Sequence, residues 1–440
     1  MYVTVHRGTQ QIGGNLIEIG TAQTRLLFDA GANLPPLDGP KAEDPFELEG
    51  LTCGEPAFDR VVLSHHHNDH CGLLGKLLPG IPVLAGEETR RILNVIADFT
   101  NQPRPEIHGS FQDGQPIQVD GIRVTPIGVE HSARDAYMFL IQGDGQNVLY
   151  TGDFRASEKA LSAVRGLLGG DGKLDLLITE GTNIRPGKQA RAGEFQGEEL
   201  VKRRAAGRMR LYGGTVFVLC SSANEDSIQA ISTAADWAGR TVCEDVFQSA
   251  VRGRAEENAQ CFVANWVKED SPARPYFDKL YRQRDLVGAE TLAKLPGKKV
   301  IFVRTSMLPF MAKYMDARPP EEETSPLLLY SMWQGYKQTA AVKRLLEFCG
   351  KRGITVEDLH ASGHASRDTV KALIDGLEPA ALLPIHCEAE DRAEFLSLHK
   401  NCLPLDDGQR WEVAWSAGIT AQRAAPEGGG RREERDAGSV

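Results

Sequence analysis

The sequence lacks the long apolar segments that would place the protein in a membrane or direct it out of the cell. No run reaches the roughly 18 consecutive apolar residues of a transmembrane helix. The start, MYVTVHRGTQ, is typical of an opening strand rather than of a signal peptide. We therefore expect a cytoplasmic protein that does not associate with membranes.

Paired cysteines are also absent. The chain has eight cysteines, and none of them belongs to a C-x-x-C pair. This spacing argues against thiolate zinc sites and against a disulfide framework, and it suits a reducing compartment. Any metal site would therefore have to use histidine and carboxylate ligands.

An excess of positive charge is missing as well. The formal net charge is −10 at pH 7. This charge argues against a protein that coats nucleic acid indiscriminately, because such binding depends on neutralised phosphates, but it leaves room for a local basic groove. With 41% hydrophobic and 25% charged residues over 440 positions, we expect a globular protein of two domains.

The apolar runs divide the chain into segments of two styles. The first part alternates β-rich runs with turns, and several of these runs end in an acidic residue or a histidine. Strand, loop and helix patterns follow a polar stretch that contains glycine and proline. We predict one domain in two parts, 1–184 and 351–420, with an inserted α/β domain over 185–350. Residues 421–440 lack apolar periodicity, which is typical of a disordered tail.

Histidine is concentrated in one place. The stretch LSHHHNDHCG holds four of the eleven histidines and an aspartate within six positions, directly after an apolar run. Residues two apart in an extended segment share a side, so His65 and His67 are able to converge while His66 points away. A following turn would present Asp69 and His70 to a second point nearby. The spacing H-x-H-x-D-H predicts one half of a two-metal site, and its ligand types suit zinc.

Further ligand candidates follow other apolar runs. They are His131 in GVEHSARDAY, Asp153 in LYTGDFR and His386 in LLPIHCE. Open α/β sheets usually build their sites at such strand ends. Each residue alone is a weak signal, because a lone histidine is more often structural, but their order and contexts together indicate a site. Four other histidines are predicted to be structural: His6, His66, His108 and His399.

Together with Asp29 in LLFDAG, these motifs resemble the metallo-β-lactamase superfamily. The resemblance implies a four-layer αβ/βα sandwich with two metal ions at the mouth between its sheets. It assigns His65, His67 and His131 to one ion, Asp69 and His70 to the other, and Asp153 to both. Asp29 would orient a ligand or the loop, a role that matters at metal sites, and its alternative is a plain turn aspartate.

Further marks narrow the resemblance to one branch. One mark is the large insertion. The others resemble three motifs of the β-CASP nucleases, which cleave RNA or DNA: Glu180 in LLITEG, His364 in ASGHAS and His386 in PIHCE. The chain is most similar to the ribonuclease J family, in GTQQIGGN, TGDF, SGHAS and PIHCE, up to about residue 415 and without the C-terminal domain of that family. The sequence Glu180-Gly181-Thr182 departs from the Asp-Ser-Thr that ribonuclease J typically has.

The residues around His364 favour phosphate binding. Apolar residues at helical spacing predict a helix that begins near Ser366, directly after Ser362, Gly363, His364 and Ala365. A glycine-containing turn at a helix N-terminus offers free backbone N–H groups and the positive end of the helix dipole. An ordinary helix cap is the alternative.

Two other groups are weaker candidates for contacts with RNA. Ser221, Ser222 and Asn224 resemble the phosphate-holding loop of ribonuclease J, although serine and asparagine are also common helix caps. Trp333 and Tyr336 are able to stack on bases of single-stranded RNA. Packing in the core or at a domain hinge is the more common role for such aromatic residues.

The resemblance implies a metal-dependent ribonuclease that acts internally or from the 5′ end and leaves a 5′-phosphate. It implies a hydroxide activated by two zinc ions, with manganese as the alternative metal. It assigns catalytic roles to Asp69, His364 and Glu180, the last by orienting His364 or His386. Single-stranded RNA is the expected partner, and a homodimer is left open.

Three alternatives to a ribonuclease remain at this point. A DNA nuclease of the same branch is disfavoured because DNA-acting members tend to have valine at the position of His386. A small-ester hydrolase that acts on lactones or thioesters is disfavoured by the insertion and by His364. A catalytically silent scaffold is disfavoured by the complete set of ligand candidates.

Overall fold

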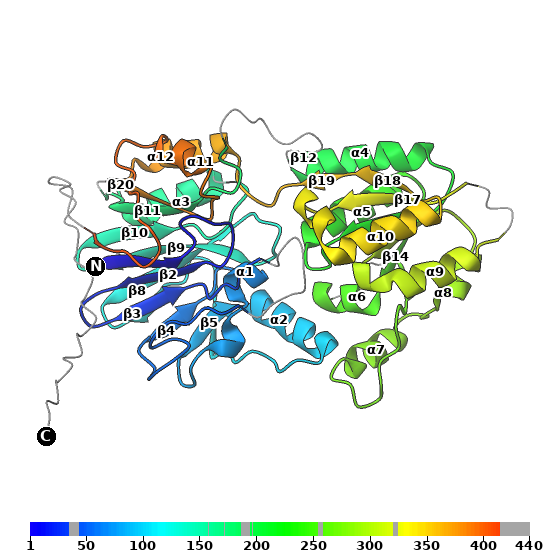
Figure 1. Ribbon diagram of the computed structural model, residues 1–440, viewed down its shortest axis with the longest axis horizontal. Coiled ribbons are helices and arrows are strands. Elements are labelled where there is room, and N and C mark those ends of the chain that lie inside the picture. The colour runs from blue at the N-terminus through cyan, green and yellow to red at the C-terminus, as the bar shows by residue number, and fades with distance from the viewer. Residues whose placement is uncertain are drawn as a thin grey trace, which may run out of the picture.

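The computed structural model describes residues 1–34, 44–156, 158–170, 172–185, 194–195, 197–253, 258–319 and 324–413. The tail predicted over residues 421–440 lies outside them. Figure 1 shows two lobes side by side, with the blue, cyan and orange parts of the chain in one lobe and the green and yellow middle part in the other. Within the described ranges no helix is long and apolar enough to cross a membrane.

The first lobe contains two sheets. The first sheet has seven strands, in the order β21 (Arg410–Glu412), β1 (Tyr2–Arg7), β2 (Leu16–Gly20), β3 (Arg25–Phe28), β4 (Arg60–Val62), β5 (Val83–Gly86) and β6 (Gly109–Phe111). The second sheet has six strands, in the order β20 (Ala381–Ile385), β11 (Leu176–Glu180), β10 (Gln146–Tyr150), β9 (Ala136–Gly143), β8 (Ile122–Val129) and β7 (Ile117–Val119). Strands from both ends of the described chain therefore meet in this lobe.

The main core of this lobe is built from both sheets. Val3 and Phe28 of the first sheet are fully buried in one cluster with Phe139, Tyr150 and Leu383 of the second. Successive side chains of a strand point to opposite faces, so one face of each sheet supplies this core and the other face is left for helices.

Helices cover the two outer faces. Against the second sheet lie α3 (Glu158–Leu168), α11 (Arg367–Leu377) and α12 (Arg392–Leu396). Against the first sheet lie α1 (Asn68–Cys71), the short 3-10 helix η1 (Leu74–Lys76) and α2 (Glu87–Thr100). The resulting four-layer αβ/βα sandwich confirms the predicted fold class.

The second lobe is an α/β domain around a parallel sheet. The strand order is β15 (Gln260–Phe262), β14 (Thr241–Asp245), β16 (Lys299–Val303), β13 (Val216–Cys220), β17 (Leu327–Ser331) and β18 (Thr355–Asp358). The central strands VFVLC and LLLYS are buried along their whole length, because helices cover both faces of a parallel sheet.

The helices of the insertion pack on both sides of this sheet. On one face lie α4 (Glu198–Leu211) and α5 (Glu225–Trp237). On the other lie α8 (Ala289–Lys294), α9 (Leu308–Asp316) and α10 (Ala340–Lys351), with the 3-10 helices η2 (Thr305–Met307) and η3 (Gln334–Gln338) in the loops after β16 and β17. Two helices pack against α2 of the first lobe: α6 (Val246–Arg252) and α7 (Arg274–Tyr281).

The insertion extends further along the chain than the sequence suggested. We placed the start of the return segment at residue 351, but β18 pairs with β17 of the inserted sheet. The next strand, β19 (His360–Ala361), pairs with β12 (Glu194–Phe195), and β20 is the first later strand that joins the sandwich. The strand-like run ITVED did not indicate to which sheet it belongs, because this edge strand buries none of the residues of TVED fully.

A buried carboxylate stabilises the edge of the first sheet. Glu18 on β2 accepts hydrogen bonds from Tyr2 Oη at 2.5 Å and Arg25 Nε at 2.8 Å, and it lies 2.7 Å from His6 Nε2. Burial raises the pKa of this carboxyl, but the three partners outweigh burial and lower the pKa to about 2. Glu18 is therefore ionised at neutral pH, and its contacts with Tyr2, His6 and Arg25 compensate the buried charge.

Candidate metal centre

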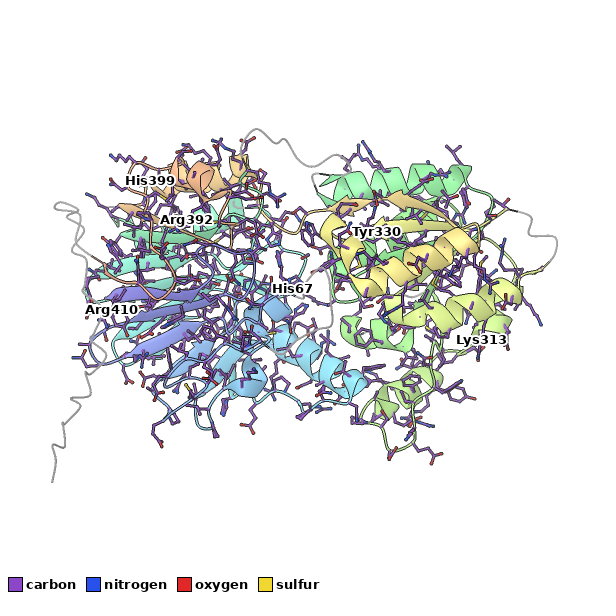
Figure 2. All side chains as sticks on the ribbon, viewed as in Figure 1. His67, Lys313, Tyr330, Arg392, His399 and Arg410 are labelled. Carbon is purple, nitrogen blue, oxygen red and sulfur yellow. The ribbon has the colours of Figure 1, made fainter. Side chains whose placement is uncertain are left out.

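The candidate ligands lie just beyond the ends of strands in the first lobe. His65 and His67 follow β4, and the single turn of α1 carries Asp69 and His70. His131, Asp153 and His386 follow β8, β10 and β20. Figure 2 shows His67 on the side of the first lobe that faces the insertion.

One group consists of three imidazoles. His65, His67 and His131 each offer a nitrogen, and these atoms lie within 4.8 Å of one another. His131 Nε2 lies 3.2 Å from His67 Nδ1. His131 Nδ1 lies 2.8 Å from the carbonyl oxygen of Gly363, to which it donates when protonated, so Nε2 keeps its lone pair for the cluster.

The second group joins two carboxylates to two imidazoles. Asp69, His70, Asp153 and His386 offer atoms that lie within 4.8 Å of one another. His70 Nε2 lies 3.1 Å from Asp153 Oδ2, and His386 Nε2 lies 3.4 Å from Asp69 Oδ2. Asp153 Oδ2 also lies 4.0 Å from Nε2 of His65 and of His131, so this carboxylate stands between the two groups.

The chemistry of the cluster fits divalent cations. Among the described residues, Nε2 of His65 and Oδ1 of Asp153 are buried without a hydrogen-bond partner. A buried polar atom without a partner is costly, and a bound cation would supply the missing interaction. Burial lowers the pKa of His65, His67 and His131, that of His67 to about 4, so these rings are neutral, as metal ligands must be.

Asp29 fixes the orientation of His70. Its carboxylate is fully buried and lies 2.7 Å from His70 Nδ1. It also accepts hydrogen bonds from the Ser64 backbone N–H at 2.6 Å, the Ser64 hydroxyl at 2.8 Å and the Tyr150 hydroxyl. A proton on Nδ1 leaves Nε2 of His70 as an acceptor directed at the cluster. This geometry favours the orienting role over that of a plain turn aspartate.

Glu180 and His364 form a third group with Asp153 and His386. His364 Nδ1 lies 3.3 Å from Glu180 Oε2 and 3.6 Å from Asp153 Oδ2. Burial lowers the pKa of His364, but the charge of Glu180, followed by that of Asp153, outweighs burial and raises the pKa to about 9. Segments that are far apart in the sequence thus bring the imidazole of His364 to the edge of the candidate ligand cluster.

The turn before α11 is built differently from our prediction. We expected Ser362, Gly363, His364 and Ala365 to present free backbone N–H groups. Instead, the N–H of His364 bonds the Ser362 hydroxyl at 3.2 Å, and the N–H of Ala365 bonds Glu180 Oε1 at 3.1 Å. That expectation is therefore wrong for these two groups, and the side chain of His364 remains as a donor.

Gly363 allows this turn to lie close to the group of three imidazoles. A Cβ atom at this position would lie only 2.5 Å from Ser132 Oγ and 3.2 Å from His131 Cε1. Only glycine allows the turn to approach closely enough for its carbonyl oxygen to bond His131.

The serine and asparagine loop after β13 serves the helix that follows it. Asn224 is the N-cap of α5, and its side chain accepts a hydrogen bond from Ser227 N. The hydroxyl of Ser221 accepts from Ala223 N at 3.3 Å, and the hydroxyl of Ser222 accepts from Arg304 Nη1 at 3.4 Å. These contacts favour the capping alternative, and a phosphate contact by this loop remains a prediction.

Three residues that the sequence analysis did not select hold the site together. The hydroxyl of Thr182 lies 2.9 Å from His386 Nδ1 and 3.2 Å from His364 Nδ1. Asn183 Nδ2 bonds the Ser362 hydroxyl and the carbonyl oxygens of His364 and Ala365.

The third is Arg155, which follows the TGDF motif. Its Nε donates to the Ser362 carbonyl oxygen at 3.0 Å, and its Nη2 lies 3.4 Å from Glu198 of the insertion. In the sequence, only position indicated these residues. Thr182 and Asn183 follow Glu180, and Arg155 follows Asp153.

Comparisons with known proteins agree with this architecture. A model of the β-lactamase superfamily domain matches residues 24–211. Ribonuclease J of Mycobacterium tuberculosis is 26% identical over 409 residues, which cover 87% of this chain and 68% of the relative. Ribonuclease J of Sinorhizobium meliloti is 24% identical over 349 residues, which cover 75% and 57%. For Helicobacter pylori ribonuclease J the identity is 23% over 442 residues, which cover 93% and 60%.

A solved structure shares the fold as well. It is a protein of unknown function from Enterococcus faecalis, with a TM-score of 0.72 and 20% sequence identity over 93% of this chain and 99% of that chain. Three observations agree on the β-lactamase superfamily fold: the four-layer sandwich, the cluster of histidines and aspartates, and the similarity to these relatives. The chain thus carries a match to the β-lactamase superfamily domain and is similar to ribonuclease J over most of its length.

Proposed function

We propose that the protein is a cytoplasmic ribonuclease that depends on divalent metal ions. It hydrolyses phosphodiester bonds of single-stranded RNA and leaves a 5′-phosphate and a 3′-hydroxyl. The observation that carries the proposal is the placement of His364 beside the ligand cluster, 3.6 Å from Asp153 Oδ2. A phosphodiester carries a negative charge that a further donor beside the metal ions would neutralise, whereas an ester or thioester is uncharged. Ribonucleases J of Mycobacterium tuberculosis and Sinorhizobium meliloti match most of the chain.

The donor set suggests how the metals are held. His65, His67 and His131 would hold one ion, Asp69, His70 and His386 the other, and Asp153 would contact both. Nitrogen and carboxylate donors suit zinc, and the more oxygen-rich second group also suits manganese. When bound, such ions would supply a water of lowered pKa and positive charge for the phosphoryl oxygens.

The residues of this chain prepare the site for that chemistry. Nδ1 of His364 faces Glu180 and Thr182, so Nε2–H is the atom left to donate a hydrogen bond to a non-bridging phosphoryl oxygen. Glu180 binds both His364 and the N–H of Ala365, and it thereby fixes the ring and the turn together. Its role in the proposal is to position His364.

The test is a substrate comparison with the purified protein. Single-stranded RNA with a 5′-monophosphate, DNA of the same sequence, and a generic lactone or thioester are each incubated with and without a chelator. We expect cleavage of RNA that the chelator abolishes. The variant Asp69→Ala should lose this activity, while Asp270→Ala, which changes an exposed aspartate of the insertion, should keep it.

Each other outcome has a distinct meaning. Preferential cleavage of DNA would support the DNA nuclease alternative, and turnover of only the lactone or thioester would support the small-ester hydrolase. Absence of chelator-sensitive cleavage of RNA would overturn the proposal. RNA cleavage retained in Asp69→Ala would overturn the assignment of the site.

A further inference from the structure

One hydroxyl group lies between two histidines of the candidate site. Thr182 Oγ1 is 2.9 Å from Nδ1 of His386 and 3.2 Å from Nδ1 of His364. His386 is a candidate metal ligand, and His364 is the proposed donor to the phosphate. A hydroxyl oxygen has two lone pairs, so that of Thr182 is able to accept an N–H from each ring.

Neighbouring strands place Thr182 beside His386. The parallel strands β11 and β20 pair with each other, and Thr182 follows the first while His386 follows the second. The backbone N–H of His386 donates to the Gly8 carbonyl oxygen at 2.7 Å, and its carbonyl oxygen accepts from Gly181 N at 3.4 Å. These contacts hold the backbone of His386 in place. What remains open is which nitrogen of its ring carries the proton.

Two acceptors compete for the proton of a neutral His386. Thr182 Oγ1 faces Nδ1, and Asp69 Oδ2 lies 3.4 Å from Nε2. His386 is fully buried, and the other acceptor near Nδ1, Asp153 Oδ1, lies 3.8 Å away, beyond hydrogen-bonding distance. A proton on Nε2 would bond Asp69 and take up the lone pair of the ring. A proton donated from Nδ1 to Thr182 leaves the lone pairs of Nε2 and Asp69 facing each other, an arrangement that a cation between them makes favourable.

His364 depends less on this hydroxyl. Its Nδ1 lies 3.3 Å from Glu180 Oε2 as well as 3.2 Å from Thr182 Oγ1. If the hydroxyl of Thr182 is lost, the carboxylate of Glu180 still accepts from Nδ1, and Nε2–H of His364 stays available as a donor. The two histidines should therefore respond differently to the same substitution.

We propose that Thr182 is a positioning residue that keeps the proton of His386 on Nδ1 and thereby makes Nε2 a ligand of the second metal ion. This inference rests on the metal assignment in the proposed function and adds to it the residue that controls one ligand. Partners that orient a metal-binding imidazole typically contribute about 10- to 100-fold to metal affinity. Thr182 should therefore affect the affinity for metal and not the chemical step.

The test measures metal affinity in the absence of RNA. The metal-free, full-length protein is titrated with zinc in competition with a chromophoric chelator, which gives the stepwise affinities for two ions. We expect Thr182→Val to weaken one of them about 10- to 100-fold and to leave the other unchanged. Thr182→Ser keeps the hydroxyl and should bind both ions like the wild type. Thr24→Val is the control, because Thr24 is a buried threonine of the first lobe whose hydroxyl donates to the Asp120 carbonyl oxygen at 3.0 Å.

Turnover separates the role of Thr182 from that of His364. Thr182→Val should need about 10- to 100-fold more metal for half-maximal cleavage of RNA and should recover the kcat of the wild type at saturating metal. His364→Ala should stay slow at every metal concentration. A kcat of Thr182→Val that remains low at saturating metal would place Thr182 in the chemical step and overturn the inference.

The affinities alone also decide the inference. Equal weakening in Thr182→Val and Thr182→Ser would show that the shape of the side chain matters and not its hydroxyl, which would overturn it. If the wild type cleaves RNA and Thr182→Val binds both ions as tightly as Thr24→Val does, the inference is wrong and the ribonuclease stands. If only Thr182→Val loses affinity but the metal-loaded wild type cleaves no RNA, the inference stands and the proposed function falls. A wild type that binds no divalent ion overturns both.

Discussion

Replacement of Asp29 by asparagine should weaken metal binding without unfolding the protein. The substitution is nearly isosteric, and the backbone at this position has φ of 62°, a left-handed conformation that asparagine tolerates well. The effect should therefore come from the loss of one acceptor oxygen and of the negative charge.

The hydrogen bonds show which contact would fail. One carboxylate oxygen of Asp29 accepts from the Ser64 backbone N–H, which cannot become an acceptor, so the amide oxygen of the substituted side chain has to take this place. The amide NH₂ then faces His70 Nδ1. Two donors cannot face each other, so His70 is driven to carry its proton on Nε2, the atom directed at Asp153.

The size of the effect follows from this change of tautomer. Loss of a partner that orients a metal ligand typically costs about 10- to 100-fold in metal affinity. This corresponds to about 1.4 to 2.8 kcal/mol. Competition with a chromophoric chelator measures the affinity, and metal analysis after dialysis counts the ions that remain bound.

Asp175→Asn is the control for this experiment. Asp175 is also a buried aspartate of the first lobe that accepts a backbone hydrogen bond, from Asn147 N at 2.8 Å, and it belongs to none of the metal groups found among the described residues. We expect it to bind metal like the wild type. A folded Asp29→Asn variant with the metal affinity of the wild type would refute the orienting role of Asp29.

Three further predictions concern stability and turnover. Glu18→Gln should remove a stabilisation that is fully present above pH 4.5, because the folded pKa of Glu18 is depressed to about 2. In urea unfolding with a chelator present, the difference between wild type and variant, on the order of 3 kcal/mol at most, should shrink as the pH falls from 4.5 toward 2. His364→Ala should lower kcat for RNA by about 100-fold or more while the bound metal, measured by metal analysis, stays constant. Arg155→Gln should lower kcat because the Ser362 carbonyl oxygen loses its donor. It should cause no further loss in a His364→Ala background if Arg155 acts through that turn, and additive losses in this double-mutant cycle would contradict the idea.

Local patterns in the sequence were sufficient for the layers of the fold. Buried strands such as LLLYS are directly visible as apolar runs, and the helix after residue 366 follows from apolar residues on one face. The sheet to which the short polar strand β18 belongs was predicted wrongly, because its place at a sheet edge depends on pairing with β17 and not on its own side chains.

The candidate ligands were also visible in the sequence, because their residue types and spacing are specific. What the sequence did not reveal is how the turn at His364 is supported. Its N–H groups looked free until Glu180, 185 residues from Ala365, was found to occupy one of them. Thr182, Asn183 and Arg155 act through partners that are distant in the chain, and local patterns carry no information about such contacts.

The sequence alone therefore determined which side chains are available: an H-x-H-x-D-H loop, and single histidines and carboxylates that each follow an apolar run. Periodicity and spacing are local properties, and a strand end carries its polar residue wherever the strand is placed. Only the tertiary structure decided which of these residues meet, that Asp153 stands between two groups, and that His364 borders the cluster. The order of strands in two sheets, and not the order of residues in the chain, sets these distances.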